Sequence, residues 1–434
     1  MDRILNVDIY PRNSDLESAY AEFSLPAYPY ELRCAMREAR VDEHTEIDFA
    51  VYNYGRAAFL AGNFEHIKDA RMLRGMNALM MKVAEMSDWE LAAFEGLVLM
   101  EASDEEIMLP LERLYNLAAS VSDCHVLFDV TDDEQLGRFF ADNGFMPELD
   151  GLSEEELSRL DYRKIGREKR KENGGVFLEE MTGYVEWDGD ITEAWQSVNL
   201  EPVEPDYAIL MELRRTDAQD IPPVILKLPA VPGAIQSAMQ ELRVRDWSGV
   251  SMRCLDCKVP AVGKMLASLG SPADISQASV LLAGLTDDQA ILCEALLEAV
   301  PCADLSEAAA MLQSVEQYTL TPELSTPAEY AKADLLAMLG EETANLLIPC
   351  VGLDVYGGHL LSKGTAAMTK YGALRRKDGL PLRAPLEQAR SVEGRASAGA
   401  VQTDSQERHA PEDSGKKTAR KRGRRAAERQ QDEK

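Results

Sequence analysis

The stretch LPAYPYELRCAMREARV, residues 25–41, returns 203 positions later as LPAVPGAIQSAMQELRV, residues 228–244. Nine of the seventeen positions are identical. The shared residues are mainly turn prolines and the apolar positions of a helix, so the element is expected to pack a helix onto a sheet. Its recurrence indicates a tandem duplication of a unit of about 180 residues.

Two further matches follow in the same order. The stretch MSDWELAAFEGLVLM, residues 86–100, corresponds to LTDDQAILCEALLEAV, residues 285–300. The stretch MTGY, residues 181–184, corresponds to MTKY, residues 368–371. Three matches in one order indicate that the repeat extends over both halves of the chain.

The predicted fold class is α+β, an elongated multi-domain chain of two similar units. Strand-like alternation flanks the repeated helix, and helical periodicity follows it, so each unit is predicted to be a small β-β-α-β domain, a helical domain and a short β-containing end segment. These parts are expected at 1–68, 69–160 and 161–190, then, after a linker at 191–204, at 205–265, 266–350 and 351–380. A disordered basic tail is expected at 381–434, which lacks long apolar runs.

The chain contains 75 acidic and 46 basic residues. The tail holds 9 of the acids and 13 of the bases, so residues 1–380 carry 66 acids and 33 bases, a net charge of −33. Such a body repels nucleic acid or presents carboxylates to a basic partner. Duplex DNA carries one charge per roughly 1.7 Å, so this excess corresponds to on the order of 56 Å of duplex. Mimicry of DNA is therefore physically reasonable.

The sequence offers little that points to catalysis. Nucleotide-binding, zinc-protease and serine-hydrolase motifs are absent, and Cys254 and Cys257 form a single C-x-x-C pair where a structural zinc site needs four ligands. We therefore expect no catalytic, cofactor-binding or metal-binding residues and no enzymatic activity. Seven scattered cysteines, no membrane-length apolar run and no signal-peptide pattern favour a cytoplasmic protein.

Acidic clusters fit the S/T-x-x-E capping box at 87–90, 103–106, 131–134 and 153–156. Carboxylates there also suit the positive end of the helix dipole. Each cluster alone is typical of a helix cap. Caps do not explain the total acidic excess.

The stretches TDDEQLGRFFADNGFMPE, residues 131–148, and LDYRKIGREKRKENGGVFLEEMTGYVE, residues 160–186, resemble the C-terminal part of ArdA-type antirestriction proteins. That family has an acidic helix followed by a conserved terminal segment. The equivalent positions here are Asp161, Tyr162, Gly166, Arg167, Glu168, Gly175, Phe177 and Gly183. The stretch AVYNYG near residue 50 is also similar, with Asn53 in place of an acid. The resemblance covers residues 1–190.

This resemblance implies a highly acidic protein of conjugative elements and phages that mimics bent B-form DNA, dimerises, and blocks the DNA-binding groove of type I restriction-modification enzymes. The acids of the family's antirestriction motif, where protomer contacts are also expected, fall on Asp132, Asp133, Glu134, Asp142 and Glu148. The other candidate phosphate-mimicking acids are Asp104, Glu105, Glu106, Glu154, Glu155 and Glu156.

The chain departs from the family in having two units and a basic tail. The second unit either replaces the second protomer, giving a monomeric mimic, or lengthens a homodimer. Six bases within residues 163–171 are expected to pair with local acids or to lie off the mimicking face. The acidic body is not expected to bind DNA or membranes, whereas the tail is a candidate contact for nucleic acid. The alternative function is an acidic interaction or regulatory protein of a conjugative element or phage, without DNA mimicry.

Overall fold

The computed structural model describes residues 2–12, 19–102, 108–149, 151, 153–218, 220–266 and 272–388. Contacts divide the chain into Met1–Pro385 and Leu386–Lys434, and the helices and strands named below lie in the first of these units. The fold is mixed α+β and, within the described residues, holds four small three-stranded antiparallel sheets. Of the expected tail, residues 389–434 lie outside the described residues.

The first sheet has the strand order β2-β1-β3. Its elements are β1 (Leu5–Pro11), β2 (Ala21–Leu25), α1 (Pro29–Glu38) and β3 (Ile47–Asn53). Alternation in β1 buries Leu5, Val7 and Ile9 on the face that belongs to the core. Leu32 and Met36 of α1 join the same core, so the repeated helix does pack onto its sheet.

Three helices and a 3-10 turn follow this sheet. They are η1 (Gly55–Leu60), α2 (Ala70–Glu85), α3 (Asp88–Glu101) and α4 (Leu111–Ala119). Asp69 accepts a hydrogen bond from the backbone of Met72 and so caps α2, and Ser87 with Glu90 forms a capping box on α3. Buried side chains of these helices continue the hydrophobic core of the first sheet.

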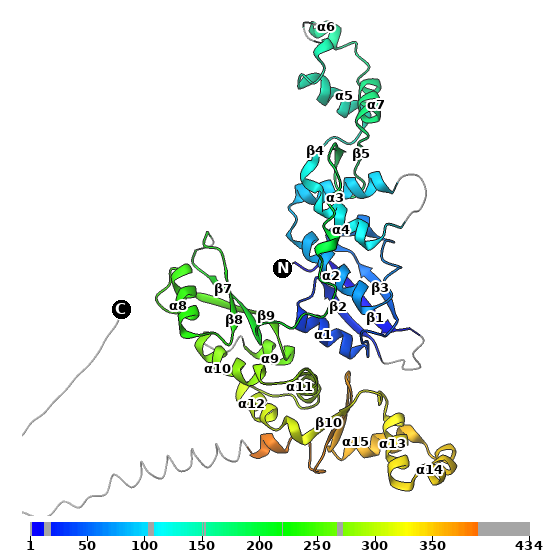
Figure 1. Cartoon of the computed structure of the whole chain (residues 1–434), viewed down its shortest axis with the longest axis vertical. Coiled ribbons are helices and arrows are strands. Elements are labelled where there is room, and N and C mark those ends of the chain that lie inside the picture. The colour runs from blue at the N-terminus through cyan, green and yellow to red at the C-terminus, as the bar shows by residue number, and fades with distance from the viewer. Residues whose placement is uncertain are drawn as a thin grey trace, which may run out of the picture. The chain divides into compact units, whose positions relative to one another are not determined.

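A second sheet with the order β4-β6-β5 contacts α3, and its Tyr184 lies in a buried cluster with Leu136 and Phe140 of the helix that follows β4. The elements are η2 (Val121–Asp123), β4 (Cys124–Phe128), α5 (Asp133–Asp142), η3 (Pro147–Leu149), α6 (Glu154–Leu157), α7 (Tyr162–Asn173), β5 (Val176–Phe177) and β6 (Gly183–Trp187). In Figure 1, α5 and α7 run side by side. The expected boundary at residue 160 separates β4 from β6, which are hydrogen-bonded in one sheet, and α7 occupies a range that was expected to be mainly β.

We define the first half of the chain as residues 2–200. The expected linker, residues 191–204, begins within it and is hydrogen-bonded to α4 and to Ser120, the residue that follows α4. It contains η4 (Trp195–Ser197). Asn116 of α4 accepts a hydrogen bond from the Trp195 backbone at 2.8 Å, and Ser120 accepts one from the Thr192 backbone at 2.9 Å. The segment therefore runs along α4 rather than spanning open solvent.

The second half, residues 207–388, contains two more sheets, with the orders β8-β7-β9 and β10-β12-β11. Its elements are β7 (Ile209–Arg215), β8 (Val224–Leu228), α8 (Pro232–Glu241), β9 (Val250–Cys257), α9 (Pro260–Met265), α10 (Pro272–Ala283), α11 (Asp287–Ala299), α12 (Leu305–Gln313), η6 (Val315–Gln317), β10 (Tyr318–Thr321), α13 (Pro327–Leu339), α14 (Glu341–Leu347), η7 (Ile348–Cys350), α15 (Leu353–Ser362), β11 (Ala366–Thr369) and β12 (Gly372–Arg376).

Several local features occur in both halves. The Leu25–Pro26 and Leu228–Pro229 peptide bonds are both cis, and Arg40 and Arg243 both have positive φ, 58° and 54°. Thr286 and Gln289 form a capping box on α11 as Ser87 and Glu90 do on α3. The shared turn and cap residues thus adopt the same local geometry in each half.

The short match between MTGY and MTKY does not extend to the strands. Strand β6 begins at Gly183, within the first motif, whereas β12 begins at Gly372, after the second. Each glycine lies close to a carbonyl of the neighbouring strand, Leu127 for Gly183 and Thr321 for Gly372. The structure therefore places Gly372 in the position of Gly183, two residues after Lys370, with which the sequence match aligns Gly183.

Within the described residues, no single helix is long and apolar enough to cross a membrane. One bent pair, Glu341–Cys350 with Leu353–Ser362, satisfies the criteria of length and composition only when its two parts are taken together.

Candidate functional site

Three of the five acids assigned by the resemblance, Asp132, Asp133 and Glu134, lie at the start of α5, whereas Asp142 ends this helix and Glu148 lies in η3. Asp132 is the N-cap, and its carboxylate accepts hydrogen bonds from the backbone N–H groups of Glu134 and Gln135 at 2.8 and 2.9 Å. The capping residue is therefore Asp132, one position after the Thr131 of the predicted box. Its carboxylate offsets unpaired N–H groups at the positive end of the helix.

The next two acids form ion pairs with bases. Asp133 binds Arg170 at 2.9 Å, and Arg167 lies 3.7 Å from it. Glu134 binds Arg138 at 3.0 Å, with Arg163 at 3.7 Å. Three of the four bases belong to α7, so the basic segment at 163–171 offsets the charge of α5 locally.

Close approach of α5 and α7 makes this pairing reachable. A Cβ atom at Gly137 would overlap the Tyr162 carbonyl, and one at Gly166 would overlap the Asp133 carbonyl. The two glycines let the helix backbones touch. Arginine side chains of α7 then lie over the first turn of α5.

The remaining candidate acids differ in their surroundings. Glu155 binds Arg159 one turn later at 2.5 Å, and hydrogen bonds from the backbone and hydroxyl of Ser153 lower the pKa of Glu156. Asp142 and Glu148 are exposed, and no basic side chain of the described residues lies within 4 Å of either carboxylate. Asp104, Glu105 and Glu106 lie outside the described residues, as does the side chain of Glu154.

An acidic pair missed by the sequence reasoning lies on the outer face of the first sheet. Asp8 of β1 and Glu22 of β2 are direct cross-strand partners. Burial and the charge of Glu22 raise the pKa of Asp8. Like charges placed directly opposite each other destabilise a sheet. The alternation of Asn6, Asp8 and Tyr10 with the buried residues of β1 was the available sequence signal.

Aromatic side chains border this pair. The Tyr52 hydroxyl donates a hydrogen bond to Glu22 at 2.5 Å. Tyr10, Tyr20 and Tyr52 are all exposed. The outer face of the first sheet thus combines negative charge with exposed aromatic rings.

The corresponding place in the sheet of the second half is neutralised. Glu212 of β7 lies opposite Ile225 and Arg253 in the sheet register. It forms ion pairs with Arg253 and, at 3.0 Å, with Arg214. The two sheets therefore share a strand order but present different charges on their outer faces.

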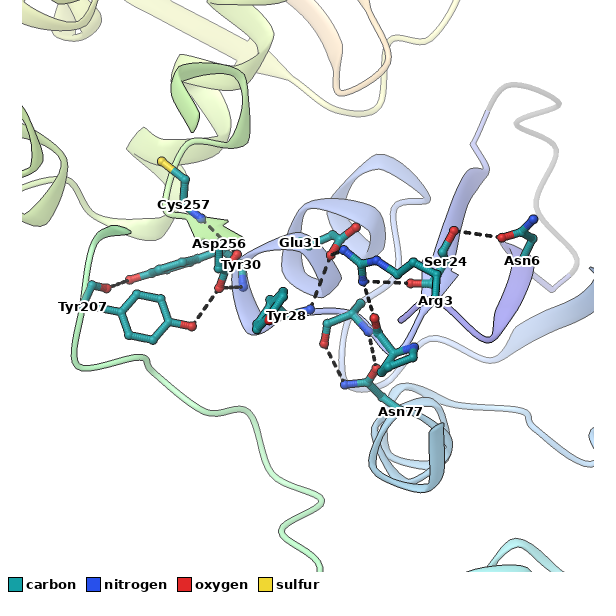
Figure 2. Close-up of polar contacts among 12 residues, drawn as sticks. Arg3, Asn6, Ser24, Tyr28, Tyr30, Glu31, Asn77, Tyr207, Asp256 and Cys257 are labelled. Carbon is teal, nitrogen blue, oxygen red and sulfur yellow. Dashed lines mark hydrogen bonds and ion pairs between the residues drawn. The ribbon is translucent and has the colours of Figure 1, made fainter. Parts of the chain in front are cut away.

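Helix α1 also contacts the second half of the chain, as Figure 2 shows. The Tyr30 hydroxyl donates to the Tyr207 carbonyl at 2.5 Å, and the Tyr30 backbone N–H donates to the Asp256 carboxylate at 3.2 Å. The Tyr207 hydroxyl donates to the same Asp256 oxygen at 2.9 Å. Burial raises the pKa of Asp256 to about 6, although hydrogen bonds from the Tyr30 N–H, the Tyr207 hydroxyl and the Cys257 N–H act in the opposite direction.

Ion pairs and apolar packing continue the interface between α1 and the second half of the chain. Arg33 pairs with Asp287, Arg37 with Asp288 at 3.4 Å, and Lys370 with Glu38 at 2.6 Å. Cys34 packs in a small buried cluster with Ile291, Ala295 and Tyr371. These residues cover the face of α1 that does not pack on its own sheet.

Within the described residues, no hydrogen bond or ion pair joins the repeated helix α8 to the first half of the chain. Gly233 and Ser237 occupy the positions of Tyr30 and Cys34, and both are exposed. Val231, which begins this face, is 71% exposed. Sequence reasoning treated the two helices as equivalent packing elements. The replacement of an aromatic residue and a cysteine by glycine and serine was the signal that one of them has a second partner.

No group of three or more His, Cys, Asp or Glu side chains among the described residues is arranged to hold a metal ion. Comparisons with protein-family models, with curated proteins and with solved structures give no match. Function is therefore inferred from the charges and contacts of this chain.

Proposed function

We propose that this protein is an antirestriction protein of the ArdA type that mimics B-form DNA and occupies the DNA-binding groove of type I restriction-modification enzymes. The observation that carries the proposal is the net charge of −33 over residues 1–380. A groove that binds DNA is lined with basic residues, and an acidic body gains counterion release there as DNA does.

The outer face of the first sheet supports the proposal. Asp8 and Glu22 face each other without a basic side chain within 4 Å in the described structure, although this arrangement lowers the stability of the sheet. Exposed Asp142 and Glu148 add charges that are free of ion pairs within the same residues. Carboxylates without an ion-pair partner within 4 Å are the groups best suited to take the place of phosphates.

We further propose that the two halves arose by duplication and that the second half takes the place of a second protomer. Matching strand orders in two pairs of sheets support the duplication. The contacts of Tyr30 with Tyr207 and Asp256 support a covalently joined pair of units. A monomer in solution is the expected state, and equilibrium sedimentation measures it.

The test is inhibition of DNA cleavage by purified type I enzymes. Near-stoichiometric inhibition is expected at low salt, with potency that falls as salt rises. The control is a chain truncated after residue 388, because Leu382 is buried and its carbonyl accepts a hydrogen bond from the Tyr318 hydroxyl at 2.7 Å. Mimicry by the acidic body requires that the truncated chain still inhibits. Absence of inhibition across several type I enzymes at low salt overturns the proposal.

One observation favours the second candidate, an acidic interaction or regulatory protein of a conjugative element or phage. Helix α13 contacts both α14 and α15, and these three helices expose Met338, Leu346 and Val355 to 63, 75 and 81%. Exposed apolar side chains gathered on neighbouring helices are typical of protein-binding surfaces. Under this alternative, Leu346→Asp with Val355→Asp abolishes capture of transfer proteins, and restriction subunits are not recovered. Under DNA mimicry the same variant inhibits cleavage as the parent chain does.

A further inference from the structure

A β-bulge brings the two cysteines of the C-x-x-C pair to one face of β9. In a regular strand, residues three positions apart point to opposite faces. Here Cys254 pairs with Met211 while Cys257 pairs with Ile209, so the register shifts and three residue steps on β9 match two on β7. The extra residue of the bulge places both cysteines opposite positions of β7 that share a face.

The two thiols are close enough on that face for each to influence the pKa of the other. The Cys254 thiol donates a hydrogen bond to the Asp256 carbonyl at 3.5 Å. Helix α9 covers them at Gly263, where a Cβ atom would lie 3.1 Å from the Cys254 sulfur and 3.0 Å from the Cys257 Cβ. A larger residue at position 263 would crowd both side chains. The glycine therefore leaves the sulfurs the space they occupy.

The two cysteines differ in exposure and in acidity. Cys254 is partly exposed and Cys257 is buried. The neighbouring Cys257 side chain lowers the pKa of Cys254, whereas burial raises that of Cys257. A thiolate is the attacking species in thiol–disulfide exchange, so Cys254 is the accessible nucleophile and Cys257 the second thiol that closes the bond.

We propose that Cys254 and Cys257 form a reversible intramolecular disulfide by exchange with a low-molecular-weight disulfide of the oxidised glutathione class. The Cys254 thiolate attacks one sulfur of the small disulfide, forms a mixed disulfide and releases one small thiolate, which takes up the proton lost by Cys254. Cys257 then loses its proton, its sulfur attacks the Cys254 sulfur, and the second small thiolate that leaves takes up that proton. The two protein thiols are oxidised, and the small disulfide is reduced to two thiols.

The test uses the full chain carrying Cys350→Ser, which removes an exposed thiol. The reduced protein is incubated with oxidised glutathione, quenched with acid, alkylated and analysed by peptide mass spectrometry. The parent is expected to yield a linked Cys254–Cys257 peptide that dithiothreitol reverses. In Cys257→Ala, Cys254 is expected to accumulate the glutathione adduct instead, because no second thiol can displace it.

Alanine substitutions at two glycines, one beside the cysteines and one distant from them, provide a test and its matched control. Gly263→Ala is expected to lower the rate of disulfide closure severalfold without removing a thiol, whereas Gly233→Ala, on the exposed face of α8 with open space around it, leaves the rate unchanged. Stable glutathione adducts on Cys254 in the parent, or no reaction at Cys254 in either chain, overturn the proposal. Circular dichroism of each variant verifies that the fold is retained.

Discussion

The backbone N–H of Tyr30 donates a hydrogen bond to the carboxylate of Asp256, 226 positions later in the chain, at 3.2 Å. The same carboxylate oxygen accepts a hydrogen bond from the Tyr207 hydroxyl. Asp256 thus connects α1 of the first half with β9 of the second. Changes at this residue report directly on the contact between the two halves.

The charge state of Asp256 is expected to make stability depend on pH. Burial raises its pKa from 3.8 to about 6, so the unfolded chain loses this proton first as the pH increases. The folded state then binds more protons, and the free energy of unfolding falls between about pH 4 and pH 6. Relative to Asp256→Asn, the parent loses up to roughly 3 kcal/mol over this window. Urea unfolding at each pH measures the difference.

Asp42 provides a control of the opposite sign. Hydrogen bonds lower the pKa of the Asp42 carboxylate, and the one from the Thr45 hydroxyl has the largest effect. Relative to Asp42→Asn, the parent is therefore expected to lose stability as the pH falls below 4. A difference between the parent and Asp256→Asn that is flat or increases from pH 4 to pH 6 contradicts the assignment for Asp256.

Adjacent glycines in α15 are expected to respond to alanine in opposite ways. A Cβ atom at Gly357 would overlap the Pro327 carbonyl of α13, whereas one at Gly358 meets nothing within 4 Å. Gly357→Ala is expected to destabilise the protein by roughly 1–3 kcal/mol. Gly358→Ala is expected to stabilise it by about 0.5–1 kcal/mol, because alanine favours the helix. Thermal unfolding distinguishes the two, and similar midpoints would refute the close packing of α13 on α15.

Paired and unpaired acids are expected to contribute differently to inhibition if the proposed function holds. The double variant Asp142→Asn with Glu148→Gln removes exposed charges, whereas Glu134→Gln with Glu155→Gln removes charges already paired with arginines. The first is expected to weaken inhibition by about two- to fivefold more per charge. Both variants change the net charge equally. Equal losses of inhibition would show that only the total charge matters.

Removing one member of the like-charge pair is expected to separate stability from function. Glu22→Gln relieves the repulsion, so the pKa of Asp8 falls and the sheet becomes more stable by roughly 0.2–1 kcal/mol. The glutamine oxygen can still accept the hydrogen bond from Tyr52. Nuclear magnetic resonance titration of Asp8 measures the change, and inhibition assays should show a weaker inhibitor. An unaltered Asp8 titration would contradict the coupling.

Local patterns sufficed to predict the first sheet and the helices that follow it. Alternation in β1, helical spacing in α1 and the Ser87–Glu90 box on α3 are all encoded within a few neighbouring residues. Strand β4 was missed because it has only five residues and its partner β6 begins 55 positions after it ends. Non-local pairing of this kind leaves little trace in a short sequence window.

Helix α7 escaped prediction for a different reason. Gly166 is its one buried residue, so the helix carries no apolar stripe. It is held by close backbone approach to Gly137 and by ion pairs such as Arg170 with Asp133. The acids of the candidate site could be read from the sequence. Which of them are neutralised depends on how α5 and α7 cross, and that crossing is a property of the folded chain.

Helix α8 differs from α1 in a way that affects how many such units could be joined by the same contact. If each unit carried a helix like α1, with an aromatic residue and a cysteine on its free face, every unit could engage the next, and copies could be added without limit. In α8, Gly233 and Ser237 stand in place of that aromatic residue and that cysteine, so the helix lacks this contact face. Under the proposed duplication, the second unit therefore lacks the contact face that the first unit presents, and restoring tyrosine and cysteine at these positions would provide the first step toward a three-unit array.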